Sequence, residues 1–249
     1  MGVLNLTPDS FSDGRKYHTI DNAVAYVHQM ISDGADIIDL GAQSTRPMAT
    51  RISVEEELER LIPVLESSKG ITTSEVKLLS VDTFYAKVAG EEVCKGAHIV
   101  NGVPAGTLDP KMPSGFRTDL RIRDAKSAGI PAWHVILDPG IGFSKNTEQN
   151  LDILMGLGKI RDELSKKSLA ASRSPLLIGP SRKRFLGTIC ARPNAVDRDP
   201  DTVACVTTGI LGGANIERVL NVTHNVDAVK LCDAMRKRNQ FVTRLKAFG

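Results

Sequence analysis

The sequence contains few aromatic residues and no long apolar run. Aromatic residues make up only 4% of the 249 residues, so a surface that stacks nucleic-acid bases is not expected. The formal net charge of +3 is also too small to predict a nucleic-acid partner. Because no run of about 18 apolar residues occurs, no membrane-spanning helix is expected.

Cysteines are scarce as well, and they form no CxxC pair. Their wide spacing disfavours a thiolate metal site and predicts small buried side chains in a reducing compartment. No leader segment precedes the first apolar run, which predicts a cytoplasmic location by default, with the mitochondrion as the alternative. The cysteines are Cys94, Cys190, Cys205 and Cys232.

Motifs of nucleotide binding and of nucleophilic catalysis are missing. There is no Walker pattern and no GxGxxG. We expect His98 and His134 at the starts of strands, away from a site. His18 and His28 are expected in a loop and on a helix surface. With no Ser-His-Asp or Cys-His set, the sequence favours a reaction that depends on positioning and charge stabilisation.

Short runs rich in Val, Ile and Leu alternate with helical patterns along the whole chain. Such dense apolar runs are typical of parallel strands buried on both faces. The alternation predicts an α/β fold with a parallel sheet, and the absence of a linker predicts one domain over residues 1–249. The expected strands are 1–6, 36–40, 76–81, 98–100, 134–137, 175–179 and 215–222.

Helix signals lie between these runs. Asp21 is a predicted N-cap, Ser53 with Glu56 reads as a capping box, and Gly96 is a stop signal. The expected helices are 21–35, 53–66, 86–97, 119–129, 148–164, 199–214 and 225–238.

Polar residues follow nearly every expected strand at its carboxyl end. A closed (β/α)8 barrel of the TIM type carries its chemistry at this rim, whereas an open sheet binds only near a switch point. The pattern therefore predicts a TIM-type barrel, incomplete because about seven strands are recognisable. The polar runs are 5–13, 43–46, 82–83, 101–102, 138–140, 181–184 and Asn221.

Carboxylates and an amide stand out among these residues. Asp39 falls within an expected strand, Asp82 at a strand end and Asp138 just past one. Asp82 and Asp138 can accept paired N–H bonds from an amino-substituted heterocycle, and Asn101 can both donate and accept at a ring edge. A single Asp is more often a capping or hydrogen-bonded structural residue. Their common position at strand ends favours binding.

Basic residues supply the opposite charge. Arg46, in the STRP segment 44–47, can hold a carboxylate or phosphate with two hydrogen bonds. Residues 182–184 read Arg-Lys-Arg after a strand, which is either a solvated charge run or an anion contact at the rim.

Five segments together resemble dihydropteroate synthase, most closely its plant form: NLTPDSFSDG, GAQSTRP, SVDTF, LDPGIGFSK and GPSRKRFLG. The resemblance implies a (β/α)8 barrel that joins p-aminobenzoate to hydroxymethyl-dihydropterin diphosphate and releases diphosphate, in folate biosynthesis. It also implies bound Mg²⁺ and a homodimer.

The resemblance assigns residues by motif. Catalytic roles fall to Lys183, Asp82 and Arg218, and Asn5 matches the Mg²⁺ ligand. The first loop, Thr7 to Gly14, and the STRP loop are expected to close over the substrates. The implied substrate-binding residues are Asp82, Asn101, Asp138, Lys183, Ser44, Thr45, Arg46, Pro47, Ser181, Phe185 and Arg218.

Two departures leave alternatives open. Residues 106–131 have room for about one helix where the family fits another βα unit, and Leu220 replaces a histidine that would help to bind diphosphate. The chain could therefore be a catalytically impaired pterin-binding remnant or splice form. A pterin-dependent methyltransferase is a weaker alternative, because that class lacks the STRP segment and the lysine of SRKRF.

Overall fold

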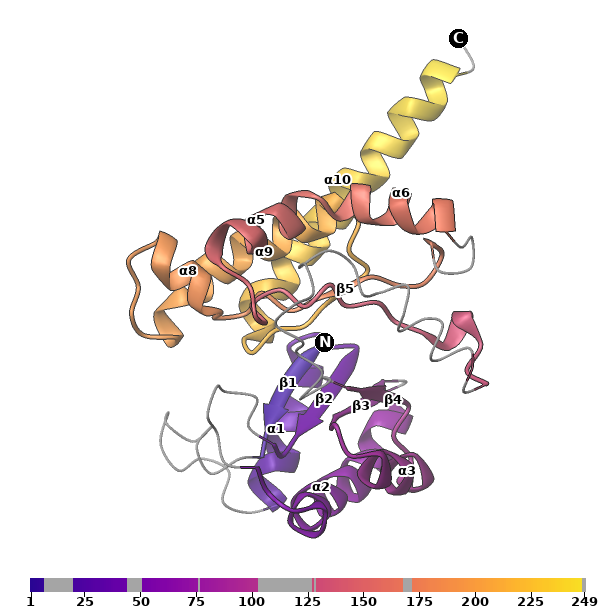
Figure 1. Cartoon of the computed structure of the whole chain (residues 1–249), viewed down its shortest axis with the longest axis vertical. Coiled ribbons are helices and arrows are strands. Elements are labelled where there is room, and N and C mark those ends of the chain that lie inside the picture. The colour runs from indigo at the N-terminus through magenta and orange to yellow at the C-terminus, as the bar shows by residue number, and fades with distance from the viewer. Residues whose placement is uncertain are drawn as a thin grey trace. The chain divides into compact units, whose positions relative to one another are not determined.

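The computed structural model divides into two compact units, Met1–Pro110 and Lys111–Gly249 (Figure 1). The residues described are 1–6, 20–43, 51–75, 77–102, 127, 129–167 and 172–247, with side chains to 238. The predicted loop residues 7–14 and 44–47, and nearly all of the expected helix 119–129, lie outside the described residues.

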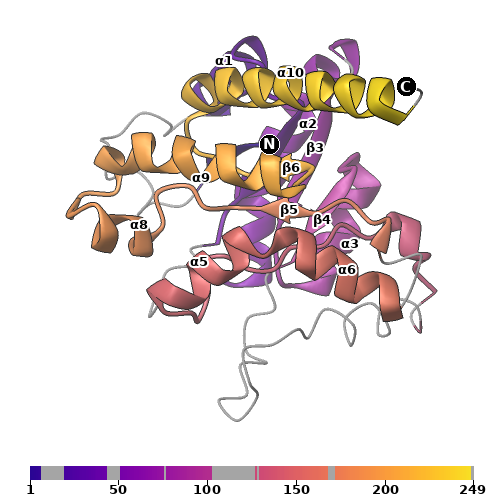
Figure 2. The same ribbon diagram turned by 90° about the horizontal axis from the view of Figure 1, so that it is seen from above.

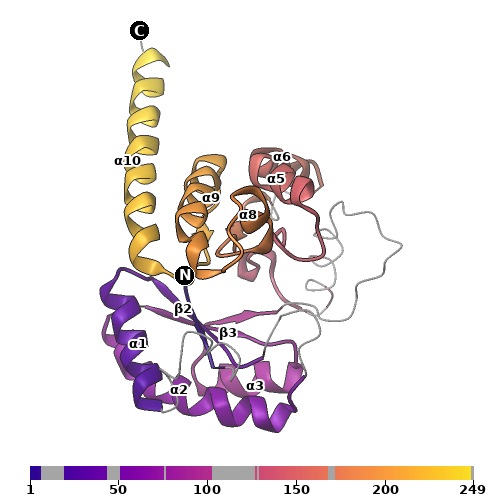
Figure 3. The same ribbon diagram turned by 90° about the vertical axis from the view of Figure 1, so that its left-hand side faces the viewer.

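The first unit is a parallel four-stranded sheet with helices between its strands. The strands are β1 (Gly2–Asn5), β2 (Ile37–Gly41), β3 (Leu78–Asp82) and β4 (Ile99–Asn101), in that order across the sheet. The helices, α1 (Ile20–Ser32), α2 (Val54–Ser74) and α3 (Ala86–Lys95), cover one face of the sheet (Figure 3). The predicted alternation of parallel strands and helices is confirmed here.

The core of this unit is made by alternate strand residues and the apolar stripes of the helices. Side chains alternate between the two faces of a strand, so one set faces the helices while the other is free to form a site. The strand members of the core are Leu4, Ile38, Leu40, Leu79 and Val81, and the helix members include Val27, Met30, Leu61, Leu65 and Val88.

The helix ends follow two of the three sequence signals. Ser53 caps α2, its Oγ accepting the N–H of Glu56 at 3.1 Å. Gly96 ends α3 in the left-handed conformation, with φ +112°. The prediction for Asp21 is wrong: α1 begins at Ile20, so Asp21 lies in the first turn, where its charge still favours the helix dipole.

The second unit contains a shorter parallel pair, β5 (Leu177–Ile178) and β6 (Ile216–Glu217). The strand expected at 134–137 is reduced to a single parallel bridge between Leu137 and Leu176. His134 instead ends the 3-10 helix η2 (Ala132–His134), donating its N–H to Pro131 at 2.9 Å. The expected strand is shortened because its first residue belongs to this 3-10 helix, and pairing is found at Leu137.

The helices of this unit pack as a layer. α9 (Asp199–Gly212) lies between α10 (Val222–Ala247) and α5 (Thr147–Met155), as Figures 2 and 3 both show. The single helix predicted for 148–164 is two, because α5 ends at Gly156 and α6 (Leu157–Lys167) begins after it. The short helices α8 (Arg184–Ile189) and η3 (Val196–Arg198) precede α9. None of the described helices is both long and apolar enough to cross a membrane.

Candidate active site

Three of the predicted site residues form one row at the carboxyl end of the first sheet. The strand register pairs Asn5 with Gly41, Gly41 with Asp82, and Asp82 with Asn101. Residues paired in this way share a face of a parallel sheet. Asn5, Asp82 and Asn101 are each partly buried, so the row offers two amides and a carboxylate at one edge.

Gly41 keeps this row open. A Cβ atom at Gly41 would lie 3.5 Å from Cβ of Asp82 and 3.7 Å from Oδ1 of Asn5. A side chain here would therefore fill the space between the two polar groups. Glycine leaves that space available to a ligand.

A buried carboxylate lies two residues before Gly41, on the same face of the sheet as the row. Asp39, which is 0% exposed, accepts a hydrogen bond from Nδ2 of Asn101 at 3.2 Å. An ionised carboxylate only accepts, so it selects the donor end of the amide. The carbonyl oxygen of Asn101 is thereby turned away from Asp39. The sequence singled out Asp39 as a rim carboxylate but did not predict this contact.

In the second unit, Asp138 follows the bridge at Leu137. Its Oδ1 accepts the N–H of Gly140 at 2.7 Å. Asp138 keeps an exposed surface, but the surrounding protein atoms partly desolvate its carboxyl and raise its pKa, while the Gly140 hydrogen bond and the charges of Lys183 and Arg218 oppose that shift. The carboxyl is thus held near two cations of the same unit.

The side chain of Lys183 packs against the loop that follows Asp138. Its Nζ lies 3.8 Å from the centroid of the Phe143 ring, a cation–π contact. A Cβ at Gly142 would come within 2.6 Å of Cδ of Lys183, and Gly142 has φ +80°. Glycine is therefore required at 142 for two reasons, conformation and space. The sequence quoted this loop as part of a motif but did not predict its contact with Lys183.

Lys145 stabilises the same loop through hydrogen bonds to its backbone. Its Nζ donates to the carbonyl of Gly140 at 2.9 Å and to that of Phe143 at 3.1 Å. Burial lowers the pKa of Lys145, and the nearby charge of Asp138 opposes the shift. Sequence reasoning missed this lysine, since only its position at the end of LDPGIGFSK marked it.

The remaining predicted residues of this unit lie just after β5 and β6. Arg218 is partly buried and its backbone N–H donates to Ile178 at 2.9 Å. Ser181 Oγ accepts the N–H of Leu220 at 3.1 Å, which joins the two loops. Phe185 is 5% exposed and belongs to the apolar core of the unit, so its predicted contact with p-aminobenzoate stays a prediction.

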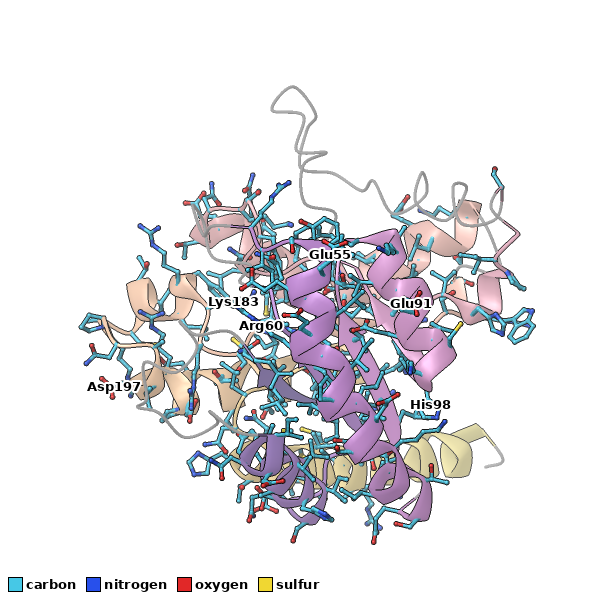
Figure 4. All side chains as sticks on the ribbon, turned by 90° about the horizontal axis from the view of Figure 1, so that it is seen from below. Glu55, Arg60, Glu91, His98, Lys183 and Asp197 are labelled. Carbon is cyan, nitrogen blue, oxygen red and sulfur yellow. The ribbon has the colours of Figure 1, made fainter. Side chains whose placement is uncertain are left out.

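His98 and His28 lie as the sequence predicts, before β4 and on a helix surface, whereas His18 lies outside the described residues. His98, which follows α3 (Figure 4), accepts the N–H of Leu79 at its Nδ1, at 3.0 Å. His28 is exposed on α1. Within the part of the chain that the structure describes, no cluster of three or more His, Cys, Asp or Glu could hold a metal ion. Asn5 offers one amide oxygen, which suits Mg²⁺ only when substrate phosphates and waters complete the metal's shell.

The chain matches known proteins over nearly its whole length. The sequence profile of the family described as "Pterin binding enzyme" matches residues 1–119 and 116–220. The mitochondrial folate synthesis bifunctional protein of Arabidopsis thaliana is 56% identical, covering 96% of this chain and 50% of that protein. The dihydropteroate synthase of Bacillus subtilis is 38% identical, covering 94% of this chain and 87% of that enzyme.

A solved structure gives the same result. The dihydropteroate synthase of Xanthomonas albilineans with 4-aminobenzoic acid superposes with a TM-score of 0.80 at 34% identity, covering 95% of this chain and 92% of that one. This likeness confirms the predicted fold class, an α/β fold of the (β/α)8 TIM-barrel type. Among the described residues the strands form two separate parallel sheets.

The matches also show that a segment is absent. The Arabidopsis alignment runs over 276 residues, more than the 249 residues of the chain, so the relative carries residues without a counterpart here. The family profile matches in two pieces that meet at residues 116–119, inside the stretch where the sequence predicted a missing βα unit. The chain spans half the length of the Arabidopsis protein. It belongs to the pterin binding enzyme family, among the dihydropteroate synthases.

Proposed function

We propose that this chain condenses p-aminobenzoate with hydroxymethyl-dihydropterin diphosphate and releases diphosphate. The observation that carries the proposal is the row of Asn5, Asp82 and Asn101 at the carboxyl end of one sheet, in a chain of this family. We further propose that residues 1–249 form one pterin-binding domain.

Pterin recognition falls to the acidic and amide groups. The pterin presents a guanidine-like edge, whose paired N–H groups suit a carboxylate. Asp82 and Asp138 are the acceptors in this proposal, and Asn101 reads the rest of the edge. The hydrogen bond from Asn101 to Asp39, at 3.2 Å, supports a fixed amide orientation, which lowers the entropic cost of binding.

The basic residues act on the other side of the reaction. Negative charge accumulates on the diphosphate as it leaves, and fixed cations stabilise that charge most where water is excluded. In this proposal Arg218 binds diphosphate, and Lys183 contacts the pterin and frames the p-aminobenzoate pocket. The contacts of Lys183 with Gly142 and Phe143 support a preset position for its side chain.

The bond changes need no general base. The aromatic amine nitrogen attacks the pterin methylene carbon, the carbon–oxygen bond to diphosphate breaks, and diphosphate leaves with the electron pair. The proton of the amine passes to solvent. This chemistry agrees with a sequence in which no catalytic triad can be assembled.

Two further parts of the site complete the proposal. Mg²⁺ bound with the diphosphate would neutralise its charge, and Asn5 is the residue of the described chain that would hold it. We propose that a further set of residues binds p-aminobenzoate and diphosphate: Ser181, Phe185, Ser44, Thr45, Arg46 and Pro47.

A second reading is a pterin-binding protein without turnover. The absent segment near residues 116–119 favours it, because a parallel barrel that lacks a strand leaves unpaired edges. Leu220, which cannot replace a diphosphate-binding histidine, favours it as well.

One experiment separates the two readings. The purified chain is incubated with both substrates and Mg²⁺, product is followed by chromatography, and pterin binding is measured by calorimetry. Dihydropteroate formation supports the enzyme, and binding without product supports the second reading. A folded chain with neither property would overturn both.

Assembly and location are proposed from likeness. A homodimer is expected, and light scattering coupled to gel filtration measures it. The name of the Arabidopsis relative assigns that protein to mitochondria, which supports the mitochondrial alternative over the cytoplasm. Fractionation with an antibody against the chain tests the compartment.

A further inference from the structure

We propose that Asp199 is a positioning residue that joins the loop after β5 to the loop after β6, and so fixes Lys183 and Arg218. The inference rests on the function proposed above for these two cations. Asp199 lies at the start of α9, and its side chain accepts hydrogen bonds from Arg182 and Asn221.

The first half of the link is a bidentate ion pair. Nε of Arg182 donates to Oδ1 of Asp199 at 2.6 Å, and Nη2 donates to Oδ2 at 2.9 Å. Asp199 is 8% exposed. A two-bond pair of this kind fixes direction as well as distance, and it lies away from the screening of bulk water. Arg182 directly precedes Lys183 in the sequence, so the ion pair between Arg182 and Asp199 restricts the position of the Lys183 backbone.

The backbone at Arg182 depends on such support. Arg182 has φ +55°, the left-handed region that a side chain rarely adopts. Its N–H donates to Oγ1 of Thr202 at 3.0 Å, and its carbonyl accepts from Nη1 of Arg198 at 3.1 Å. A conformation that costs free energy persists only when its surroundings determine it more than once. All of these contacts come from the start of α9 or the turn before it.

The second half of the link reaches the loop after β6. Nδ2 of Asn221 donates to Oδ2 of Asp199 at 2.9 Å, and Oδ1 of Asn221 accepts the N–H of His224 at 3.1 Å. Asn221 follows Arg218 by three residues, and Leu220 between them donates to Ser181. One carboxylate therefore holds both loops.

The ionisation of Asp199 agrees with this role. Burial alone would raise its pKa, but the hydrogen bonds from Arg182 and Asn221 outweigh burial and hold the pKa of Asp199 below its ordinary value. The carboxylate is charged at neutral pH and can accept from both partners at once.

The test compares Asp199→Asn with Asp201→Asn. Both remove one carboxylate from the first turn of α9, but Asp201 pairs with Arg192 instead, at 3.6 Å. Asp199→Asn should lower kcat/KM about 100-fold, because misplacing a catalytic group by roughly 1 Å costs that much. Asp201→Asn should leave kcat/KM within about 3-fold, and both variants should keep the wild-type circular dichroism spectrum.

Two further readouts exclude a merely structural role. In a Lys183→Ala background, Asp199→Asn should weaken pterin binding no further. Asp199→Asn should also speed acylation of Lys183 by a succinimidyl ester, measured by mass spectrometry, while exposed Lys159 is unchanged. The acylation needs no turnover, so its failure is distinct from failure of the proposed function. Equal loss in both backgrounds, or unchanged acylation of Lys183, overturns the proposal.

Discussion

Cδ of Lys183 lies 2.6 Å from the position that a Cβ of Gly142 would occupy. No real Cβ tolerates such a contact, so any side chain at 142 must displace the lysine. Gly142 also has φ +80°, which adds strain for any other residue. The lysine is thus fixed from the loop that carries Asp138.

Gly142→Ala should therefore lower pterin affinity and turnover, by about 10- to 100-fold. Gly129→Ala is the matched control, because Gly129 has φ +82° and no atom of the described residues lies within 4 Å of its Cβ position. Calorimetry and steady-state kinetics measure the two variants. Equal losses in both would mean that backbone strain, not displacement of Lys183, is responsible.

Lys183→Ala should abolish turnover while the chain stays folded. The side chain is partly exposed and its cation–π contact with Phe143 contributes only about 1 kcal/mol, so thermal unfolding should change little. Lys159→Ala, on the exposed side of α6, is the control and should keep full activity. Residual turnover close to wild type in Lys183→Ala would remove Lys183 from the mechanism.

Asp39→Ala should weaken pterin binding about 10-fold, because Asn101 loses the acceptor that orients its amide. Asp36→Ala is the control from the other end of the same strand. Asp36 pairs with Lys77 at 2.9 Å on the surface, where ion pairs contribute little. Titration calorimetry with a pterin measures both, and unchanged affinity in Asp39→Ala would contradict the orienting role.

Glu92→Gln should stabilise the chain at neutral pH. Burial, with the charge of Glu57, raises the pKa of Glu92 to about 8, and among the described residues its carboxyl oxygens have no hydrogen-bond partner. An acid whose pKa is raised on folding binds its proton more tightly in the folded state. Glu92 therefore does not reduce the free energy of unfolding below about pH 4.5, and it reduces that free energy increasingly as the pH rises toward about 8.

The gain in Glu92→Gln should be about 4 kcal/mol at pH 8 and near zero at pH 4.5, because the pKa rises from 4.5 to about 8 on folding and each pKa unit corresponds to about 1.4 kcal/mol. Urea unfolding across this range measures it. Glu91→Gln, exposed on the same helix (Figure 4), should change stability by less than about 0.5 kcal/mol. A pH profile of Glu92→Gln parallel to wild type would show that Glu92 does not titrate in this window.

The elements that depend on local sequence pattern were predicted correctly. The strands of the first unit and the caps at Ser53 and Gly96 follow from apolar runs and turn chemistry, and the structure confirms them. The strand predicted at 134–137 was wrong because its apolar residues satisfy the strand pattern, whereas His134 ends a 3-10 helix and Leu137 forms a single bridge.

Contacts between distant segments could not be read in this way. Asp199 follows Arg182 by 17 residues, and nothing in either segment marks the pair. The contacts of Gly142 and Lys145 depend on the folded conformation of one loop. The sequence motif identifies this loop but does not predict its conformation. For the same reason, the predicted roles of the site residues remain predictions, since they depend on a ligand between them.

The main proposal is that Asp82, Asn101, Asp138 and Lys183 bind the pterin. A crystal structure of the chain with a bound dihydropterin tests it most directly. We expect Asp82, Asn101, Asp138 and Lys183 within hydrogen-bond distance, about 2.7–3.2 Å, of the same ring system. A pterin held by Asp82 and Asn101 alone, with Asp138 and Lys183 facing solvent elsewhere, would contradict the account.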